Sequence, residues 1–189
     1  MEEAKTLLRK KFSQMRKQLG DMEKLVLNGA VAARIIALDE FVRADLVIAY
    51  AADRFEVDLR GVIEFALQQK KQVALPRFDA AKGVYDLALI EDLARDTSVG
   101  KFNLLEPRKE LPQAVLSEKA LWLIPALAFD KKGMRLGRGG GFYDRMLENA
   151  PGKRVGVFYQ CQYSDELLPS AEHDQYLHMA VTEQQTYKF

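Results

Sequence analysis

Cysteine is almost missing from this chain of 189 residues, in which Cys161 is the single one. A lone cysteine cannot form an internal disulfide, so the chain is not a small secreted domain held by disulfides, and it suits a reducing compartment. No motif pairs Cys161 with a histidine or an aspartate, which favours a structural thiol over a catalytic nucleophile. The fold must therefore be held by its own apolar core.

Long apolar runs and an excess of charge are missing as well. No apolar run approaches the roughly 20 residues of a membrane-spanning helix. The acidic start, MEEAK, resembles neither a secretory signal nor a transit peptide. A formal net charge of +1 gives no reason to expect general nucleic-acid binding. We therefore expect a soluble cytoplasmic protein with no membrane or nucleic-acid partner.

The pattern of apolar residues predicts an α/β fold. A chain of this length suits one domain, residues 1–189, that buries roughly 70% of its unfolded surface. Continuous apolar runs predict strands covered on both faces, as in a parallel sheet, while the gap at 79–83 predicts a hairpin. We expect a three-layer α/β/α domain around a mostly parallel, mixed central sheet. The strand-like runs are 46–52, 72–77, 84–90, 120–125, 154–159 and 179–182.

Helices are expected at 2–19, at 21–38, after Asp58 and at 142–147, with Asp21 and Asp58 as N-caps. The first helix places Leu8, Phe12, Met15 and Leu19 on an apolar stripe. Its basic residues spread over the remaining face, which could sit on nucleic acid or a membrane surface, although a solvated face is the favoured interpretation. These basic residues are Lys5, Arg9, Lys10, Lys11, Arg16 and Lys17.

Glycine, arginine and carboxylate crowd together only between Ile124 and Arg145, IPALAFDKKGMRLGRGGGFYDR. Five of the nine residues from Gly133 to Gly141 are glycines, so several backbone N–H groups can turn toward one anion. A helix that starts near Phe142 would add its free amides, and Arg135 and Arg138 can fork onto phosphate oxygens. The expected ligand is a polyphosphate.

The loop fits neither of two familiar phosphate-binding motifs. A P-loop requires Gly-Lys-Ser/Thr, but Gly141 is followed by Phe142 and Tyr143. A dinucleotide fingerprint that starts at Gly137 has Phe142 in place of its third glycine. A flexible loop with solvated arginines is the alternative, and the aspartates that flank the same run make it less attractive.

The stretch from Phe129 to Arg145 resembles the signature of the 5-formyltetrahydrofolate cyclo-ligase family, also called the methenyltetrahydrofolate synthetases. The pattern is Phe-Asp, two residues, Gly, one residue, Arg-Leu-Gly, one residue, Gly, one residue, Gly, an aromatic residue and Tyr-Asp-Arg. Ala126 stands where the family often has glycine, and His178 where relatives often carry an acidic residue. The resemblance extends over essentially the whole chain and implies the same α/β fold.

The resemblance implies the magnesium-dependent conversion of 5-formyltetrahydrofolate and ATP to 5,10-methenyltetrahydrofolate, ADP and phosphate. A formamide oxygen is a poor leaving group, and its phosphorylation would let a neighbouring folate nitrogen close the ring. Such a transfer requires positioning and charge neutralisation more than a nucleophilic triad. A non-catalytic nucleotide- or folate-binding module is the main alternative, and an RNA-binding protein led by the basic helix is the second. We expect a monomer.

The resemblance also implies site residues, beginning with a Lys-x-x-Leu-Arg pattern that is matched by Lys5, Leu8 and Arg9. Lys5 and Arg138 are the expected catalytic residues, and Asp144 and Asp174 the expected magnesium ligands, although Asp174 could equally be a turn residue. The expected ATP-binding residues are Lys5, Arg9, Arg135, Leu136, Gly137, Arg138, Gly139, Gly140, Gly141, Phe142 and Tyr143. The expected folate-binding residues are Ala51, Glu56, Arg138, Gly139, Gly140, Gly141 and Phe142.

Two further stretches of the sequence agree with the resemblance. Glu56 lies in a Glu-Val-Asp stretch, and a carboxylate is the natural partner for the adjacent N–H donors of a pterin. The stretch 100–107, which ends in Glu-Pro, resembles a family segment that lies near the active site.

Overall fold

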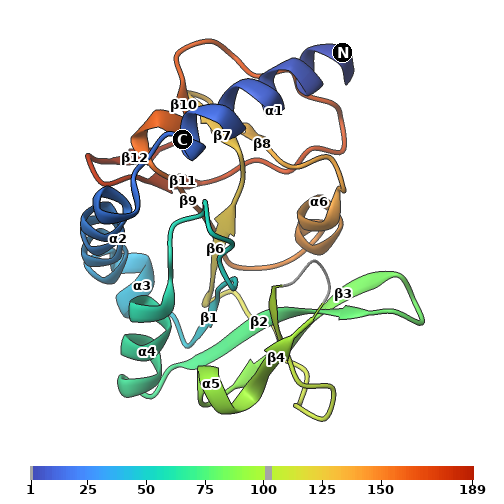
Figure 1. The fold of residues 1–189 in the computed structure, drawn as a ribbon. Coiled ribbons are helices and arrows are strands. Elements are labelled where there is room, and N and C mark those ends of the chain that lie inside the picture. Colours follow the sequence, from blue (N-terminus) through green and yellow to red (C-terminus); the bar gives the residue numbers. More distant parts are fainter. Residues whose placement is uncertain (1, 101–103) are drawn as a thin grey trace.

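The computed structural model describes residues 2–100 and 104–189, and a seven-stranded sheet lies at its centre (Figure 1). In spatial order, its strands are β12 (Thr186–Lys188), β11 (Met179–Val181), β9 (Lys153–Val157), β6 (Ala120–Pro125), β1 (Leu46–Ile48), β2 (Gln72–Asp79) and β3 (Val84–Ile90). The strands from β11 to β2 pair in parallel, whereas β12 and β3 pair antiparallel at the two edges. The predicted mostly parallel, mixed sheet is confirmed.

The central strands are apolar on both faces because both faces are covered. In β6, Leu121 and Leu123 belong to one apolar core, whereas Trp122 and Ile124 belong to the core on the opposite face. All four side chains are buried. This double burial accounts for the unbroken apolar runs that predicted the sheet.

The two outer layers differ in thickness. One face of the sheet is covered by three helices, which Figure 1 shows stacked on one side: α2 (Asp21–Ile36), α3 (Asp39–Arg43) and α4 (Arg60–Gln68). The other face is covered by a short helix and a three-stranded sheet: α6 (Phe142–Leu147), β7 (Ala128–Asp130), β8 (Arg135–Leu136) and β10 (Tyr163–Ser164). The architecture is therefore the expected α/β/α arrangement, with a thin second outer layer.

Helix α1 (Glu2–Lys17) crosses the small three-stranded sheet, as Figure 1 shows. Phe12 packs there with Leu127 and Leu136 in a separate apolar cluster. The glycine-rich loop, residues 137–141, joins β8 to α6. Helix α1 is thereby packed against the strand that leads into this loop.

The remaining elements are α5 (Leu93–Asp96), β4 (Thr97–Val99), β5 (Leu105–Pro107) and the 3-10 turn η2 (Gln160–Gln162). Strands β4 and β5 pair with each other at the edge of the molecule that carries β2 and β3. Part of the predicted 100–107 segment, residues 101–103, lies outside the described residues. Within the described ranges, no helix is long and apolar enough to cross a membrane.

Several local predictions were wrong in detail. Strand β1 ends at Ile48 instead of residue 52, and the chain beyond it forms a buried loop. Asp21 is the first residue of α2, and Gly20 is the N-cap. Asp58 lies one residue before the N-cap Leu59, although its Oδ1 still accepts the Arg60 amide at 2.9 Å. An acceptor outside the cap position thus satisfies a free amide of the helix.

Candidate active site

A cleft of about 630 Å³ opens where β1 and β6 end, beside the glycine-rich loop. In parallel sheets, ligands characteristically bind outside the carboxyl ends of the strands. Tyr50 and Ala51 line the cleft after β1, and Pro125 and Ala126 line it after β6. Every site residue expected from the sequence lines this one cleft: Lys5, Arg9, Ala51, Glu56, Arg135, Leu136, Gly137, Arg138, Gly139, Gly140, Gly141, Phe142, Tyr143, Asp144 and Asp174.

The glycine-rich loop presents its backbone to the cleft. Gly139 has φ +97° and Gly141 has φ +63°, conformations that residues with a Cβ rarely adopt. Among residues 2–100 and 104–189, no acceptor takes a hydrogen bond from the amides of 137–141. Arg9 anchors the loop, because its Nε donates to the Gly137 carbonyl at 3.1 Å. The loop therefore combines an anchored backbone with free N–H donors.

Helix α1 contributes Lys5 and Arg9 to the cleft, as the resemblance implied, whereas Arg16 is buried and does not lie on the solvated face expected for it. Lys5 and Arg16 are buried together with Phe12, so two of the basic residues lie on the packed side of the helix. Lys5 Nζ donates to Asp174 Oδ2 at 2.6 Å, and the two side chains are only 8% and 11% exposed. Positions 5, 9, 12 and 16 share one helical face, since their spacing follows 3.6 residues per turn.

Two ion pairs mark the end of the cleft near α6. Arg135 Nη2 donates to Asp144 Oδ1 at 2.6 Å, and the Arg135 side chain is buried. Burial lowers the pKa of Arg135. Burial would raise the pKa of Asp174, but hydrogen bonds from Lys5 and the Ala171 amide outweigh it, so this pKa lies below its ordinary value. The Asp174 carboxylate is thereby held in the charged form.

Asp144 and Asp174 line the cleft as carboxylates that could hold a magnesium ion shared with phosphates. Within the described ranges, no group of three or more His, Cys, Asp or Glu side chains could hold a metal. Magnesium commonly uses one or two carboxylates together with substrate phosphates and water, so a larger cluster is not required. Oδ2 of Asp144 and Oδ1 of Asp174 accept no hydrogen bond from the described residues. One oxygen of each aspartate therefore remains available.

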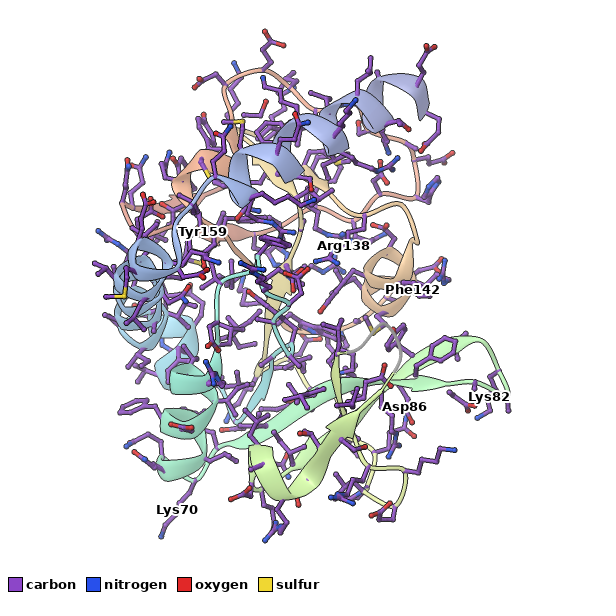
Figure 2. All side chains as sticks on the ribbon, viewed as in Figure 1. Lys70, Lys82, Asp86, Arg138, Phe142 and Tyr159 are labelled. Carbon is purple, nitrogen blue, oxygen red and sulfur yellow. The ribbon has the colours of Figure 1, made fainter. Side chains whose placement is uncertain are left out.

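At the opposite end of the cleft, Arg138 binds two carboxylates of the loop after β1. Its Nη2 donates to Glu56 Oε1 at 2.6 Å and also to Asp53 Oδ2. Burial alone would raise the pKa of Asp53. The hydrogen bonds from Arg138 and the Phe55 amide outweigh that effect, so this pKa lies below its ordinary value. Figure 2 shows Arg138 between α1 and α6.

Aromatic rings form part of the cleft wall. The Phe142 ring, at the start of α6 (Figure 2), packs edge-on against Tyr85 of β3 with 5.0 Å between ring centroids. Both residues line the cleft, as does Tyr143. Tyr85 lies on a strand, where an aromatic residue more often belongs to the core than to a ligand site. Its place in the cleft depends on a contact across 57 residues of chain, which no local pattern reveals.

The structure adds Asp53 to the residues singled out from sequence, and it places Arg16 beside Glu56 instead of on a solvated face. Leu104, Leu105 and Glu106 of the 100–107 segment line the cleft. Cys161 is absent from the residues that line it, and burial raises the pKa of its thiol to about 11. A thiol with that pKa is poorly nucleophilic at neutral pH, which agrees with the structural role expected from sequence.

The fold and the site define an α/β protein with a cation-rich cleft at the carboxyl ends of its parallel strands. Comparison with known proteins narrows this class. The model of the 5-formyltetrahydrofolate cyclo-ligase family matches residues 1–183. A 5-formyltetrahydrofolate cyclo-ligase from Haemophilus influenzae is 30% identical over 164 residues, which are 85% of this chain and 88% of that protein. The Escherichia coli K12 protein of the same name is 28% identical over 180 residues, 93% of this chain and 98% of that protein.

Solved structures agree with these relatives. The 5,10-methenyltetrahydrofolate synthetase of Aquifex aeolicus has a TM-score of 0.85 at 32% identity, covering 97% of this chain and 92% of that one. The synthetase of Mycoplasma pneumoniae has a TM-score of 0.73 at 22% identity, covering 95% of this chain and 98% of that one, and shows the likeness of fold alone. The chain therefore belongs to the 5-formyltetrahydrofolate cyclo-ligase family, a family of enzymes, and the resemblance seen in residues 129–145 is confirmed.

Proposed function

We propose that this enzyme converts 5-formyltetrahydrofolate and ATP to 5,10-methenyltetrahydrofolate, ADP and phosphate, with magnesium. The observation that carries the proposal is one cleft in which a cation-rich glycine loop faces a carboxylate and aromatic rings. The first kind of surface suits a triphosphate, and the second suits a pterin with adjacent N–H donors. Family membership supports the same pair of substrates.

The chemistry follows two balanced steps. The formyl oxygen attacks the terminal phosphorus of ATP, and ADP leaves. The neighbouring folate nitrogen, N10, then attacks the formyl carbon, the carbon–oxygen bond breaks, and phosphate departs with the former formyl oxygen while N10 loses its proton. Charge moves onto the phosphoryl oxygens in the first step, so the protein contributes mainly by fixed positive groups and positioning.

The phosphate end of the cleft has these groups. Lys5, Arg9 and Arg135 line it, and the free amides of residues 137–141 lie beside them. The helix dipole of α6 adds little, because that helix has only six residues. Magnesium would be held by the available oxygens of Asp144 and Asp174 together with phosphate oxygens, where it neutralises phosphate charge.

At the folate end, Glu56 accepts N–H donors of the pterin while Phe142 and Tyr85 pack against its ring. The Glu56 side chain is 9% exposed, and its Oε1 is occupied by Arg138. Arg138 is 52% exposed, so it can turn from this carboxylate toward a phosphoryl group. We assign Arg138 and Lys5 as the catalytic cations on this basis.

A coupled assay tests the function directly. Protein, magnesium, ATP and 5-formyltetrahydrofolate should give methenyl absorbance and ADP together, and omission of any one component should abolish both. Binding of both ligands without product would instead support a non-catalytic module. RNA binding that weakens steeply with salt and ignores magnesium would support the second alternative.

An oxygen label tests the mechanism separately from the activity. If the formyl oxygen becomes bonded to phosphorus before ring closure, a heavy-oxygen label in the formyl group must appear in inorganic phosphate. Mass spectrometry can count that label. Direct closure with loss of water, in which ATP hydrolysis drives only a conformational step, would place the label in solvent and would overturn the phosphoryl-transfer mechanism.

A further inference from the structure

Arg16 of α1 is an unusual buried cation. Its side chain is only 4% exposed, yet its Nε and Nη1 have no hydrogen-bond partner among the described residues. A guanidinium that is removed from water without hydrogen bonds is unfavourable, so such a group in a folded protein calls for an explanation. Packing alone does not supply one, because an aliphatic side chain could fill the same position without that penalty.

The nearest acidic groups to Arg16 are the two carboxylates that Arg138 binds. Arg16 Nη1 lies 3.8 Å from Glu56 Oε1, and Arg16 Nη2 lies 3.9 Å from Asp53 Oδ2. Arg138 Nη2 donates to these same two oxygen atoms. Two arginines thus share one pair of acceptors, and only Arg138 is within hydrogen-bond distance of them.

The two arginines differ in freedom. Arg138 comes from the glycine-rich loop and is 52% exposed, whereas Arg16 is fixed in a helix and buried. If Arg138 turns to the phosphoryl group, the largely buried Glu56 would lose its nearest cation. A shift of about 1 Å would then bring Arg16 to charge-assisted hydrogen-bond distance, roughly 2.8 Å, and would satisfy its unpaired N–H groups.

We propose that Arg16 is a positioning residue for folate: it is the permanent counter-charge that holds the Glu56 carboxylate in place when Arg138 leaves it during the reaction. This inference rests on the proposed function, because only that reaction requires Arg138 at the phosphate and Glu56 at the pterin. Lys5, Arg9 and Arg16 share one face of α1, and about 16 Å of helix separates the first from the last. One helix therefore places Lys5 and Arg9 in the cleft and Arg16 beside Glu56.

Kinetic variants test the inference with a readout that a merely structural role would not produce. Arg16→Met should raise the KM for 5-formyltetrahydrofolate by about 10-fold or more, while the KM for ATP stays within about 2-fold. Arg16→Lys should recover part of the folate affinity. Lys10→Met is the matched control, since it removes a positive charge from an exposed position of the same helix and should leave both KM values unchanged.

The pair with Glu56 gives the sharper test. In a Glu56→Gln background, adding Arg16→Met should change the folate KM by less than about 2-fold, because the carboxylate that Arg16 serves is already gone. Multiplicative effects of the two changes, or an equal rise in both KM values, would overturn the inference. If Arg16→Met lowers the melting temperature too far for kinetics, Arg16→Gln, which also removes the charge, carries the same comparisons, and an unchanged folate KM in that variant would equally overturn the inference. Wild-type protein that forms no product overturns the proposed function and this inference with it, whereas active wild type with an insensitive Arg16 overturns this inference alone.

Discussion

The two loops that border the cleft, residues 53–58 and 137–141, are built in opposite ways. In the loop after β1, the chain binds itself: Asp53 Oδ1 accepts the Phe55 amide at 2.7 Å, and Glu56 Oε2 accepts the Asp53 amide at 3.0 Å. In the glycine-rich loop, the amides of 137–141 bind no acceptor in the described ranges. The first loop presents fixed carboxylates to a ligand, and the second presents free backbone N–H groups.

This difference matches the chemistry of two ligands. A phosphate accepts hydrogen bonds on many oxygens and is served well by backbone donors and mobile cations. The edge of a pterin donates hydrogen bonds and requires an acceptor in one place, which a self-bonded loop provides. Arg138 belongs to the glycine-rich loop and binds Asp53 and Glu56 of the loop after β1, so it connects the two ends of the cleft. Substitutions in either loop, or of Arg138 itself, test this arrangement.

Arg138→Ala should have the largest effect. An arginine that stabilises a transferring phosphoryl group contributes about 10³-fold or more to kcat, and we expect a loss of that size. Arg138→Lys should restore little, because an ammonium lacks the guanidinium fork that can serve two acceptors. Arg43→Ala is the control: Arg43 is 79% exposed and paired with Asp39 on α3. A folded Arg138→Ala protein with near-normal kcat would show that Arg138 only links the loops.

Asp144→Asn should lower turnover by about 100-fold, since even outer-shell partners of a metal contribute about 10–100-fold to affinity or activity. Excess magnesium should recover part of the rate, because an amide oxygen is a weaker but usable ligand. The variant should fold, although its melting temperature should fall, because the buried Arg135 loses its counter-charge. Wild-type turnover at ordinary magnesium concentration would remove Asp144 from the metal site.

The two loops also differ in how well sequence could find them. The glycine-rich loop is local, since its glycines, arginines and flanking aspartates lie within one short window, 129–145. The proposed folate end is assembled from distant parts of the chain: Arg16 and Arg138 approach Glu56 from 40 and 82 positions away. No periodicity could pair them, and the helical pattern placed Arg16 on the wrong face because a buried cation looks like a solvated one in sequence.

In the fold too, the sequence predicts features that depend on local residues better than features that depend on distant contacts. Strands with long apolar runs, such as β6, and the β2–β3 hairpin agree with the sequence prediction. The short strands β7, β8 and β12 were not anticipated, because two or three residues carry no measurable alternation. Their pairing depends on tertiary context: β10 joins β7 from more than 30 positions away.

Variants at the two ends should affect different substrates. Arg9→Ala and Lys5→Ala should each raise the KM for ATP by about 10–100-fold, since a charge-assisted hydrogen bond contributes about 1.5–3 kcal/mol. Glu56→Gln should raise the KM for 5-formyltetrahydrofolate by a similar factor and leave ATP little affected. Initial rates over a grid of both substrate concentrations measure both KM values of each variant. Equal changes for both substrates in any variant would mean that the two ends have been assigned wrongly.

Matched alanine variants within the glycine-rich loop should separate backbone strain from side-chain bulk. Gly139→Ala forces a Cβ onto φ +97° and should destabilise the protein by about 1–3 kcal/mol. Gly137→Ala would meet only Arg135 Nη1 at 3.7 Å, an ordinary contact, and should be nearly neutral. Urea unfolding of both variants gives the comparison. Equal stability would show that the loop relaxes freely and that its conformation is not fixed by glycine.

The smallest expected effect is a pH dependence that distinguishes the loops. The folded pKa of Asp53 lies below its ordinary value, since the hydrogen bonds from Arg138 and the Phe55 amide outweigh the effect of burial. Its stabilising contribution is therefore complete above its unfolded pKa, near 3.9, and is lost as pH falls through the lower folded pKa. The difference in unfolding free energy between wild type and Asp53→Asn should shrink over that acidic window, whereas the difference for Gly139→Ala should not change, because it titrates no group. Urea unfolding of the three proteins, measured from pH 6 down to the acid limit of folding, tests this prediction. If the difference in unfolding free energy between wild type and Asp53→Asn stays constant with pH, Arg138 does not hold this carboxylate in solution.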